Sequence, residues 1–546
     1  MRKLTAWDPD REMNNQPPPF ENVNLFASDR VLGEAFAREC SGNDRLRLNA
    51  FGERMGSAEM WAMAASVHRH LPELRTFDRY GERIDEVEFH PAYHSIMGEA
   101  VEAGIPSLAW NRAKGSHALH AALEYLLAKV EPSVCCPITM TYAAPAALQH
   151  EPAIAAEWLP RILTGKYDGS SREAARKAGV TIGMAMTEKQ GGSDVRANTT
   201  RAEPSADGSY RLEGHKWFCS APMSDAFLTL AQAPGGLTCF LAPRWRRNGQ
   251  RNAIHLMRLK DKVGDRANAS AEIEYRGAEA LRIGEEGRGV ATILDMVHHT
   301  RLDCAIAPAA YMHTALAQAL WHTSHRSAFG KKLIDHALMR PVLADLAIES
   351  EAATVLAFRI ARSFDESPAS EEAALFSRLA TPIAKYWLNK RVVGQVAECM
   401  ECHGGAGYVE EWPIARFYRQ APLNGIWEGS GNVICLDVLR ALSRSPQSGE
   451  IYLQELKRGA GANEKLDRFV DEAARQLRQP AEESAARRLA EALALALQGA
   501  LLVQHAPSAV SDAFCNTRLD VQCHTYGSFA ANVDIAAIVT RAMPAI

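Results

Sequence analysis

One carboxylate stands where the sequence could support proton transfer. Glu428 lies in the string Gly425-Ile-Trp-Glu-Gly-Ser-Gly-Asn432, directly before an apolar helical run from Val433 to Leu439. Burial beside a large aromatic ring such as Trp427 raises the pKa of a carboxyl group towards values that suit a general base. The glycines and the helix start would also suit a dipolar or anionic ligand. A simpler interpretation stays open, in which Glu428 only complements the helix N-terminus.

A second string lies where the chain changes from helical to alternating periodicity. It reads Ala185-Met-Thr-Glu-Lys-Gln-Gly-Gly-Ser-Asp-Val-Arg-Ala197. Gly191 and Gly192 allow the backbone to approach a ligand closely, and the hydroxyls of Thr187 and Ser193 can donate or accept hydrogen bonds. Taken alone, this string is also compatible with an ordinary polar turn.

Two further strings invite a chemical interpretation. Arg326-Ser-Ala-Phe-Gly-Lys-Lys-Leu333 offers an arginine that could pair with phosphate, although alone it is typical of a solvated helix end. Cys399-Met-Glu-Cys402-His403 has the spacing of a c-type haem attachment site. Covalent haem attachment requires export, and the N-terminal sequence has no apolar signal segment. We therefore interpret both cysteines as residues of a packed helix, and we expect no bound metal.

The elements that must position these strings fall into four stretches. Residues 1–180 predict an N-terminal arm, broken by Pro17-Pro18-Pro19, and then helices from about Phe51 to Lys166. Residues 181–285 alternate in short segments rich in β-formers, which indicates a small antiparallel barrel or sandwich. Helical periodicity returns over residues 286–445. After a turn-rich linker at residues 443–449, residues 446–546 predict an additional Ala-rich helical region.

The composition is that of a globular chain. Its 546 residues are 47% hydrophobic and 23% charged, with a formal net charge of −4, and this length suggests about three or four domains. The balance excludes a largely disordered protein and a chain that grips nucleic acid with its whole surface. No run of about 18 apolar residues predicts a membrane span. Together with the missing signal segment, this favours a cytoplasmic protein.

Taken together and in this order, the strings resemble the signatures of the acyl-CoA dehydrogenase family. The family's Thr-Glu-x-x-x-Gly-Ser-Asp turn is matched by residues 187–194, and its Glu-Gly loop by residues 428–429. Between them lie an Arg-x-x-Phe-Gly-x-x-Leu string at 326–333 and a Gly-Gly-x-Gly-Tyr string at 404–408. The resemblance covers about residues 50–443. It implies a mostly α protein with a β middle domain, namely an N-terminal helical domain, a small antiparallel β-barrel and a four-helix bundle.

The resemblance also implies a chemistry. FAD would lie between the β-barrel and the helical bundle, and Glu428 would remove the α-proton of an acyl-CoA thioester while hydride passes to the flavin. The positions that match the family's cofactor contacts are Met186, Thr187, Gly192, Ser193, Phe218, Ser220, Arg326, Trp427, Gly429 and Asn432. Glu401 and His336 stand where the family usually has glutamines. The pyrophosphate end of the cofactor must therefore be held differently, or Glu401 points away from it.

One branch of this family, flavin-containing and linked to the response to DNA alkylation, is matched more closely. The strings Cys-Pro-Ile-Thr-Met-Thr at 136–141, Gly-His-Lys-Trp-Phe at 214–218 and Cys-Leu-Asp-Val-Leu-Arg at 435–440 resemble it. Members of this branch carry an extra C-terminal helical domain, which accounts for the residues beyond about 445. The resemblance then spans nearly the whole chain, and it implies a homotetramer with weak acyl-CoA turnover.

The competing interpretation is a protein that binds double-stranded DNA, in which FAD is structural or acts on damaged bases or alkylating agents. Duplex DNA requires clustered basic residues that meet its phosphates. Residues 446–546 hold ten basic and twelve acidic residues, so only a one-sided arrangement would serve. Arg475 and Arg478 could share one helical face, and Arg518 is a further candidate. A mixed, solvated surface is the alternative.

Overall fold

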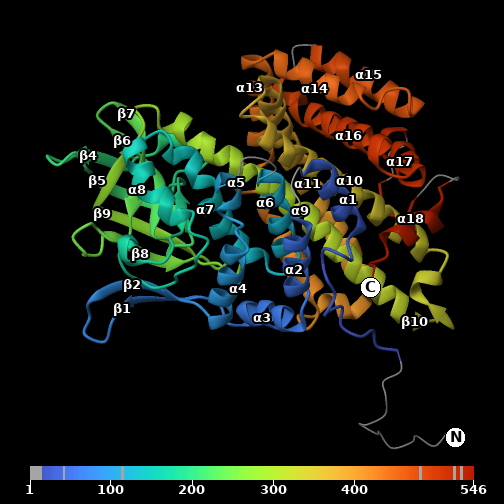
Figure 1. Cartoon of the computed structure of the whole chain (residues 1–546), viewed down its shortest axis with the longest axis horizontal. Helices are drawn as coiled ribbons and strands as arrows, with labels where there is room; N and C mark the ends of the chain where they lie inside the picture. Colours follow the sequence, from blue (N-terminus) through green and yellow to red (C-terminus); the bar gives the residue numbers. More distant parts are fainter. Residues whose placement is uncertain are drawn as a thin grey trace, which may run out of the picture.

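The chain folds into a predominantly helical body with one β-domain at one end (Figure 1). The expected mostly α architecture with a β middle domain is therefore confirmed. The first fourteen residues of the expected arm lie outside the described residues. The computed structural model describes residues 15–40, 44–111, 116–478, 482–520, 524–528 and 533–545.

Short helices make up most of the region before the barrel. They are α1 (Arg30–Glu39), α2 (Arg45–Met55), α3 (Ala58–Arg69), α4 (Pro91–Glu102), α5 (Leu108–Asn111), α6 (Ser116–Ala128), α7 (Cys135–Leu148) and α8 (Pro152–Ile162). The apolar faces of α1 to α4 and of α6 meet the long helices in one core, whereas α5, α8 and most of α7 pack in a second cluster with the barrel; on α3 the apolar face is formed by Met60, Ala64 and Val67 at three- and four-residue steps. The helical periodicity of the sequence is thus realised in packing.

A hairpin interrupts these helices, so the helical prediction over residues 51–166 is wrong at this point. Strands β1 (Glu73–Phe77) and β2 (Arg83–Glu88) pair antiparallel. Along β1, exposed and partly buried residues alternate, which is the two-residue period of a strand. Strands this short hold too few alternating positions for the period to stand out in the sequence. Both strands of the hairpin contact β8 of the barrel.

The β-domain is a closed barrel. Its strands are β3 (Ile182–Ala185), β4 (Arg201–Pro204), β5 (Tyr210–Ser220), β6 (Ala226–Ala233), β7 (Gly236–Pro243), β8 (Ile254–Leu259) and β9 (Ser270–Ile283). They follow the order β3-β6-β4-β5-β9-β7, and the additional pairing of β6 with β7 closes the sheet, while β8 pairs with β9. Most neighbours are antiparallel as expected, but β6 runs parallel to β3 and β4.

Four helices form the bundle beside the barrel. They are α9 (Gly289–His325), α10 (Met339–Glu366), α11 (Glu371–Cys402) and α13 (Gly431–Arg444), with α12 (Pro413–Gln420) in the connection before α13. α9 packs against α10 and α11, and α11 packs against α13. Cys399 and Cys402 are buried within α11, which confirms their interpretation as residues of a packed helix.

A further group of helices continues the bundle. It comprises α14 (Gln447–Lys457), α15 (Glu464–Arg478), α16 (Ala486–His505), α17 (Ser508–Phe514) and α18 (Ile535–Ala542). The connection before α14 is confined to residues 445–446, shorter than the predicted linker. α16 packs on α10, α11 and α13, and Trp387 Nε1 on α11 donates to Gln498 Oε1 on α16 at 2.9 Å. None of the described helices combines the length and the apolar character that crossing a bilayer requires.

We predict that Arg518 is a structural anchor of this C-terminal group. Its side chain is 9% exposed, and its guanidinium lies 2.5 Å from Asp345 and 2.9 Å from Glu349, both on α10. Arg518→Gln leaves the buried carboxylate of Asp345 without its counter-charge, while Glu349 keeps Arg391, so it should lower the free energy of unfolding by about 3 kcal/mol in a denaturant titration. The same substitution at exposed Arg478 should cost less than about 0.5 kcal/mol. Equal losses at the two positions would contradict this role.

Candidate functional site

The carboxylate of Glu428 sits in a strained loop. The loop joins the short turn Leu423–Gly425 to the start of α13. Glu428 has a φ of 56°, in the left-handed region, and Gly429 follows with a φ of 102°. A non-glycine residue pays roughly 1–2 kcal/mol for that conformation, so neighbouring groups must hold it there. Strain of this kind concentrates at functional sites.

One buried lysine anchors the backbone of the Glu428 loop. Lys385 lies on α11. Its Nζ donates to three backbone carbonyl oxygens of the loop, those of Asn424 at 2.8 Å, Trp427 at 2.9 Å and Gly429 at 2.9 Å. All three donors of the ammonium group are used in this way. The side chain of Asn424 completes the arrangement, because its Oδ1 accepts from Trp427 Nε1 at 2.6 Å. Lys385 therefore fixes the backbone on both sides of Glu428.

Helix α9 supplies the second set of contacts. Thr300 Oγ1 donates to Glu428 Oε2 at 2.8 Å, and Arg301 Nε donates to the backbone carbonyl of Glu428 at 3.1 Å. Arg301 is itself oriented by Asp437 on α13, with 2.8 Å between NH1 and Oδ2. The carboxylate and its own peptide group are thus tied to consecutive residues of one helix.

These surroundings set the protonation of Glu428. Burial raises the pKa of this carboxyl group, and the Thr300 hydroxyl and the charges of Lys385 and Arg301 offset part of that increase. Burial also lowers the pKa of Lys385. A carboxylate with a raised pKa, held rigidly in a half-buried loop, has the properties of a general base.

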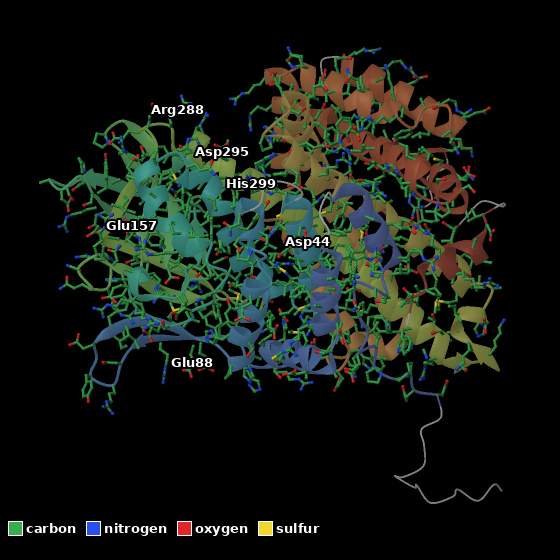
Figure 2. All side chains as sticks on the ribbon, viewed as in Figure 1. Asp44, Glu88, Glu157, Arg288, Asp295 and His299 are labelled. Carbon is green, nitrogen blue, oxygen red and sulfur yellow. The ribbon has the colours of Figure 1, made fainter. Side chains whose placement is uncertain are left out.

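A wall of aromatic and imidazole rings begins one residue before Thr300. Figure 2 shows Arg288, Asp295 and His299 following one another along α9 towards the middle of the molecule. The ring of His299 lies 5.2 Å from Trp110 and 5.5 Å from His117. Burial, and then the nearby imidazoles, lower the pKa of His117 well below its usual range. This wall therefore carries polar but uncharged rings near neutral pH.

The Thr187 string forms a compact turn at the end of β3. Glu188 is fully buried in it and accepts from Lys216 Nζ on β5 at 2.8 Å. Burial opposes ionisation of Glu188, but Lys216 and the backbone donors outweigh it and hold its pKa at about 2. The Thr187 carbonyl accepts from the Trp217 amide at 2.7 Å. A Cβ at Gly192 would lie 2.4 Å from Thr187 Oγ1, so this position requires glycine.

The predicted cofactor residues on β5 lie next to this turn. Phe218 is 47% exposed, which is unusual for a phenylalanine, and Ser220 Oγ lies 3.0 Å from Ser270 Oγ. Met186, just after β3, and Trp427, from the Glu428 loop, pack against the same apolar cluster between the barrel, α7 and α9. The structure therefore brings the two sequence strings to one region.

Other predicted cofactor residues are placed differently. Gly192, Ser193 and Asn432 are exposed. Arg326 caps the far end of α9, about 39 Å from Thr300 at 1.5 Å per residue, where it donates to the Asn15 carbonyl. The structure does not bring Arg326 to Glu428 within one chain. Glu401, where the family usually has a glutamine, is exposed as well.

The three arginines predicted for DNA do not form one surface. Arg518 is consumed by the buried ion pairs with α10, so this prediction is corrected. Arg475 is exposed and pairs with Glu472 at 2.7 Å, and Arg478 is exposed at the end of α15. Their helix carries four acidic and four basic residues: Glu464, Asp467, Asp471, Glu472, Lys465, Arg468, Arg475 and Arg478.

Sequence reasoning missed the residues that hold Glu428. Thr300, Arg301 and Lys385 are buried polar residues in long helices that are otherwise packed with apolar side chains. A lysine within Ile383-Ala-Lys-Tyr-Trp-Leu388 is the available signal, because a buried lysine demands partners. The sequence does not say which carbonyl groups those partners are.

Three family models match the chain. Residues 15–169 match the adaptive response protein AidB N-terminal domain, residues 183–278 the acyl-CoA dehydrogenase middle domain, and residues 287–443 the acyl-CoA dehydrogenase C-terminal domain. The chain therefore belongs to the acyl-CoA dehydrogenase family, a family of FAD-dependent oxidoreductases. Within that family it is similar to AidB, as the first of the three matches indicates.

Individual relatives agree with this assignment. The AidB protein of Escherichia coli (strain K12) is 45% identical over 511 residues, covering 93% of this chain and 94% of the relative. The crystal structure of Caenorhabditis elegans ACDH-11 in complex with C11-CoA matches with a TM-score of 0.83 at 27% identity, covering 98% of this chain and 93% of that one. The apo form of Bd2924 matches with a TM-score of 0.83 at 30% identity, covering 90% and 99%.

We predict that Lys385→Met releases the Glu428 loop. Three carbonyl oxygens lose their donor at once, so the strained backbone should relax and the environment of Trp427 should change. Tryptophan fluorescence of the full chain, followed with its thermal unfolding, measures both effects. Lys457→Met, at an exposed lysine of α14, is the control and should leave both signals unchanged. A Lys385→Met spectrum identical to that of the control would refute this role for Lys385.

Proposed function

We propose that this protein is an FAD-dependent acyl-CoA dehydrogenase of the AidB branch, in which Glu428 removes the α-proton of an acyl thioester. The observation that carries the proposal is the Glu428 loop, where a carboxylate with a raised pKa is held by Lys385, Thr300 and Arg301. The α-proton of a thioester is only weakly acidic, so a rigidly placed base is needed. Donors to the thioester carbonyl must also stabilise the enolate that develops.

The residues beside Glu428 suit a flavin. Trp427 offers a partly exposed ring that packs on the same apolar cluster as Met186, Phe218 offers a half-exposed ring on β5, and the Thr187 and Ser220 hydroxyls supply hydrogen bonds. The half-exposed Phe218 ring is the observation that supports this fit, because a bound planar ring system would cover it. When bound, FAD supplies the acceptor for the hydride that leaves the β-carbon of the substrate. Met186, Gly192, Ser193, Gly429 and Asn432 complete the proposed cofactor contacts.

An acyl-CoA is the substrate class that the comparisons support. ACDH-11 was crystallised with C11-CoA, and its fold matches nearly all of this chain. The ring of His299, the residue before Thr300, lies 5.5 Å from His117, and we propose that an acyl chain bound beside Glu428 meets these polar rings instead of aliphatic side chains. We infer that turnover of long unbranched acyl chains is slow in this protein. This agrees with the weak turnover expected for the branch.

The position of Arg326 indicates that a second copy of the chain takes part in the proposed cofactor site. It lies too far from Glu428 to reach the same cofactor, and the neighbouring Phe329 is 97% exposed. A symmetric assembly would cover Phe329 and carry Arg326 to the cofactor of another copy. We therefore propose a homo-oligomer, with a tetramer as the expected form.

The proposal does not include duplex DNA as a ligand. Arg518 is buried in ion pairs, and the charges on α15 are balanced along the helix that holds Arg475 and Arg478. Acidic residues interspersed with basic ones on one face weaken any contact with phosphates. The described residues of the C-terminal region therefore give no observation that supports DNA binding.

We predict that Glu428→Gln abolishes acyl-CoA-dependent bleaching of the flavin absorption band. Glutamine keeps the shape of the side chain but cannot accept the proton, so bleaching should slow by at least about 10⁴-fold while FAD stays bound. Stopped-flow absorbance and the ratio of flavin to protein measure the two quantities. Glu285→Gln, at an exposed glutamate before α9, serves as the control. Undiminished bleaching in Glu428→Gln would contradict the assignment of Glu428 as the base. A chain that cannot be loaded with FAD would contradict the proposal that FAD is the cofactor.

We also predict a displaced pH dependence. Because burial raises the pKa of Glu428, the fraction of ionised base falls as pH decreases, and it falls at higher pH than for an ordinary glutamate near ~4.3. Thr300→Val removes a hydrogen bond that favours the ionised form, so the acid limb of the bleaching rate should move to still higher pH. A pH profile of the bleaching rate in both proteins tests this shift. An unmoved limb in Thr300→Val would contradict it.

A further inference from the structure

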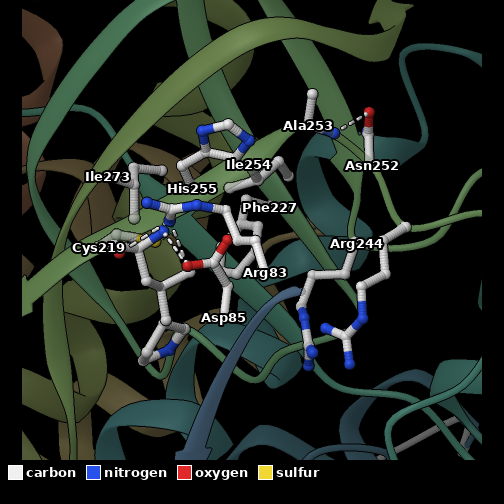
Figure 3. Close-up of a pocket in the computed structure, with 13 residues that line it drawn as sticks. Arg83, Asp85, Cys219, Phe227, Arg244, Asn252, Ala253, Ile254, His255 and Ile273 are labelled. Atoms are coloured by element: carbon white, nitrogen blue, oxygen red, sulfur yellow. Dashed lines mark hydrogen bonds and ion pairs between the residues drawn. The ribbon is translucent and has the colours of Figure 1, made fainter. Parts of the chain in front are cut away.

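A cavity lies on the barrel, outside the site described above. It has a volume of about 220 Å³ and opens between the β1–β2 hairpin and β8 (Figure 3). Its walls come from β2, from the segment Arg244–Ala253 before β8, from β8 itself and from the inner face of β5. The proposed function uses none of the residues that line this cavity.

The lining is strongly basic. Three arginines, Arg83, Arg244 and Arg251, face one carboxylate, that of Asp85, among the described residues that line the cavity. Asp85 is not available to neutralise the others, because its Oδ1 already accepts from Arg83 NH1 at 2.6 Å and from the Leu256 amide at 3.2 Å. Figure 3 shows this pair on the side of the cavity opposite Arg244.

Arg244 and Arg251 converge on a single oxygen. Ser171 Oγ lies 3.1 Å from NH2 of Arg244 and 3.4 Å from NH2 of Arg251. Arg251 pairs with Glu86, whereas the contacts of the Arg244 guanidinium within the described chain are to neutral oxygens, Ser171 Oγ and the Met223 carbonyl at 2.9 Å. Two like charges gathered around a neutral hydroxyl repel each other, and a bound anion would remove that cost.

The remaining walls are compatible with an anion. Burial, and then Arg83, lower the pKa of His255, so its ring is neutral near pH 7 and can donate a hydrogen bond. Burial raises the pKa of the Cys219 thiol, which therefore adds no negative charge at the floor. Phe227 and Ile273 close the apolar side. The carboxylates whose charges act on Arg244, those of Asp225, Glu86 and Asp85, each already pair with another basic residue, Lys177, Arg251 and Arg83 respectively.

We propose that this cavity binds a small phosphate group, either free phosphate or the phosphate of a small ester. A phosphate presents oxygens in several directions and can accept from the Arg244 fork and, at the same time, from the remaining N–H groups of Arg251, which already donates to Glu86 and to the Ile84 carbonyl; a carboxylate offers one edge to one fork. The volume of about 220 Å³ is below the roughly 300–1,000 Å³ of pockets for drug-sized ligands, which excludes a dinucleotide or an acyl-CoA. Arg244 and Arg251 hold the phosphate, and His255 donates to it.

This site is distinct from the proposed flavin region, although both use β5. Successive side chains of a strand point to opposite faces. Phe218 and Ser220 therefore face the proposed cofactor, while Cys219 between them is fully buried and forms part of the cavity floor. Occupation of the cavity does not require the catalytic residues.

Isothermal titration of the full, flavin-loaded chain tests the proposal. Inorganic phosphate and glycerol phosphate are titrated at constant ionic strength, with acetate and chloride as comparison anions. Phosphate, its ester or both should bind, and acetate and chloride should not; the two phosphate arms show which source is preferred. Arg244→Gln should weaken phosphate binding by about tenfold or more, because a charge-assisted pair of hydrogen bonds is lost. Arg244→Lys keeps the charge without the fork and should weaken binding by a smaller factor.

Arg288→Gln is the matched control, since Arg288 lies at the opposite end of the barrel from β2 (Figure 2). It should bind phosphate like the unaltered chain. If Arg244→Gln proves unstable, the comparison of Arg244→Lys with Arg288→Gln decides the question. Equal binding of phosphate and acetate, no binding of either phosphate, or phosphate affinity that does not respond to Arg244→Lys would overturn the proposal. The last outcome would place any bound phosphate in the cofactor or thioester region instead.

Discussion

The structure depends on the buried ammonium group of Lys385. Without it, the carbonyl oxygens on both sides of Glu428 would be left without donors, and the left-handed backbone at Glu428 would be held only by its contacts with α9. Arg301 and Thr300 then tie the same residue to α9. The base is therefore positioned by three helices at once, and its loop needs no rigidity of its own.

Much of this arrangement follows from the sequence, and the part that does not has a physical reason. Periodicity predicts the helices and the barrel because each needs only local spacing, and the Thr187 and Glu428 strings stand out through their glycines. The β1–β2 hairpin could not be predicted, because its strands are too short to show the two-residue period of a strand. The role of Lys385 could not be predicted, because its hydrogen bonds join residues about forty positions apart in the sequence, and motif spacing does not connect residues that far apart.

The same limit explains the fate of the predicted arginines. Arg475, Arg478 and Arg518 look equivalent in the sequence, since each is a basic residue in a helical stretch. Folding separates them, because only Arg518 meets two carboxylates of α10 and becomes buried. Arg244 shows the opposite case: nothing in the sequence marks it, and only the fold places it beside Arg251, with side-chain hydrogen bonds to the neutral oxygens of Met223 and Ser171. A sequence shows which residues are charged, but only the fold shows which of those charges are paired.

The position of Trp387 links the C-terminal helices to the candidate site. Lys385 points from α11 into the Glu428 loop, and two residues later Trp387 donates to Gln498 on α16. The helix that carries the ammonium group is therefore also held by α16, a helix that supplies none of the proposed catalytic or cofactor residues. In evolutionary terms, the C-terminal extension cannot be shed as a spare module, because a chain that ended after α13 would keep every proposed catalytic residue and lose the support that aligns them.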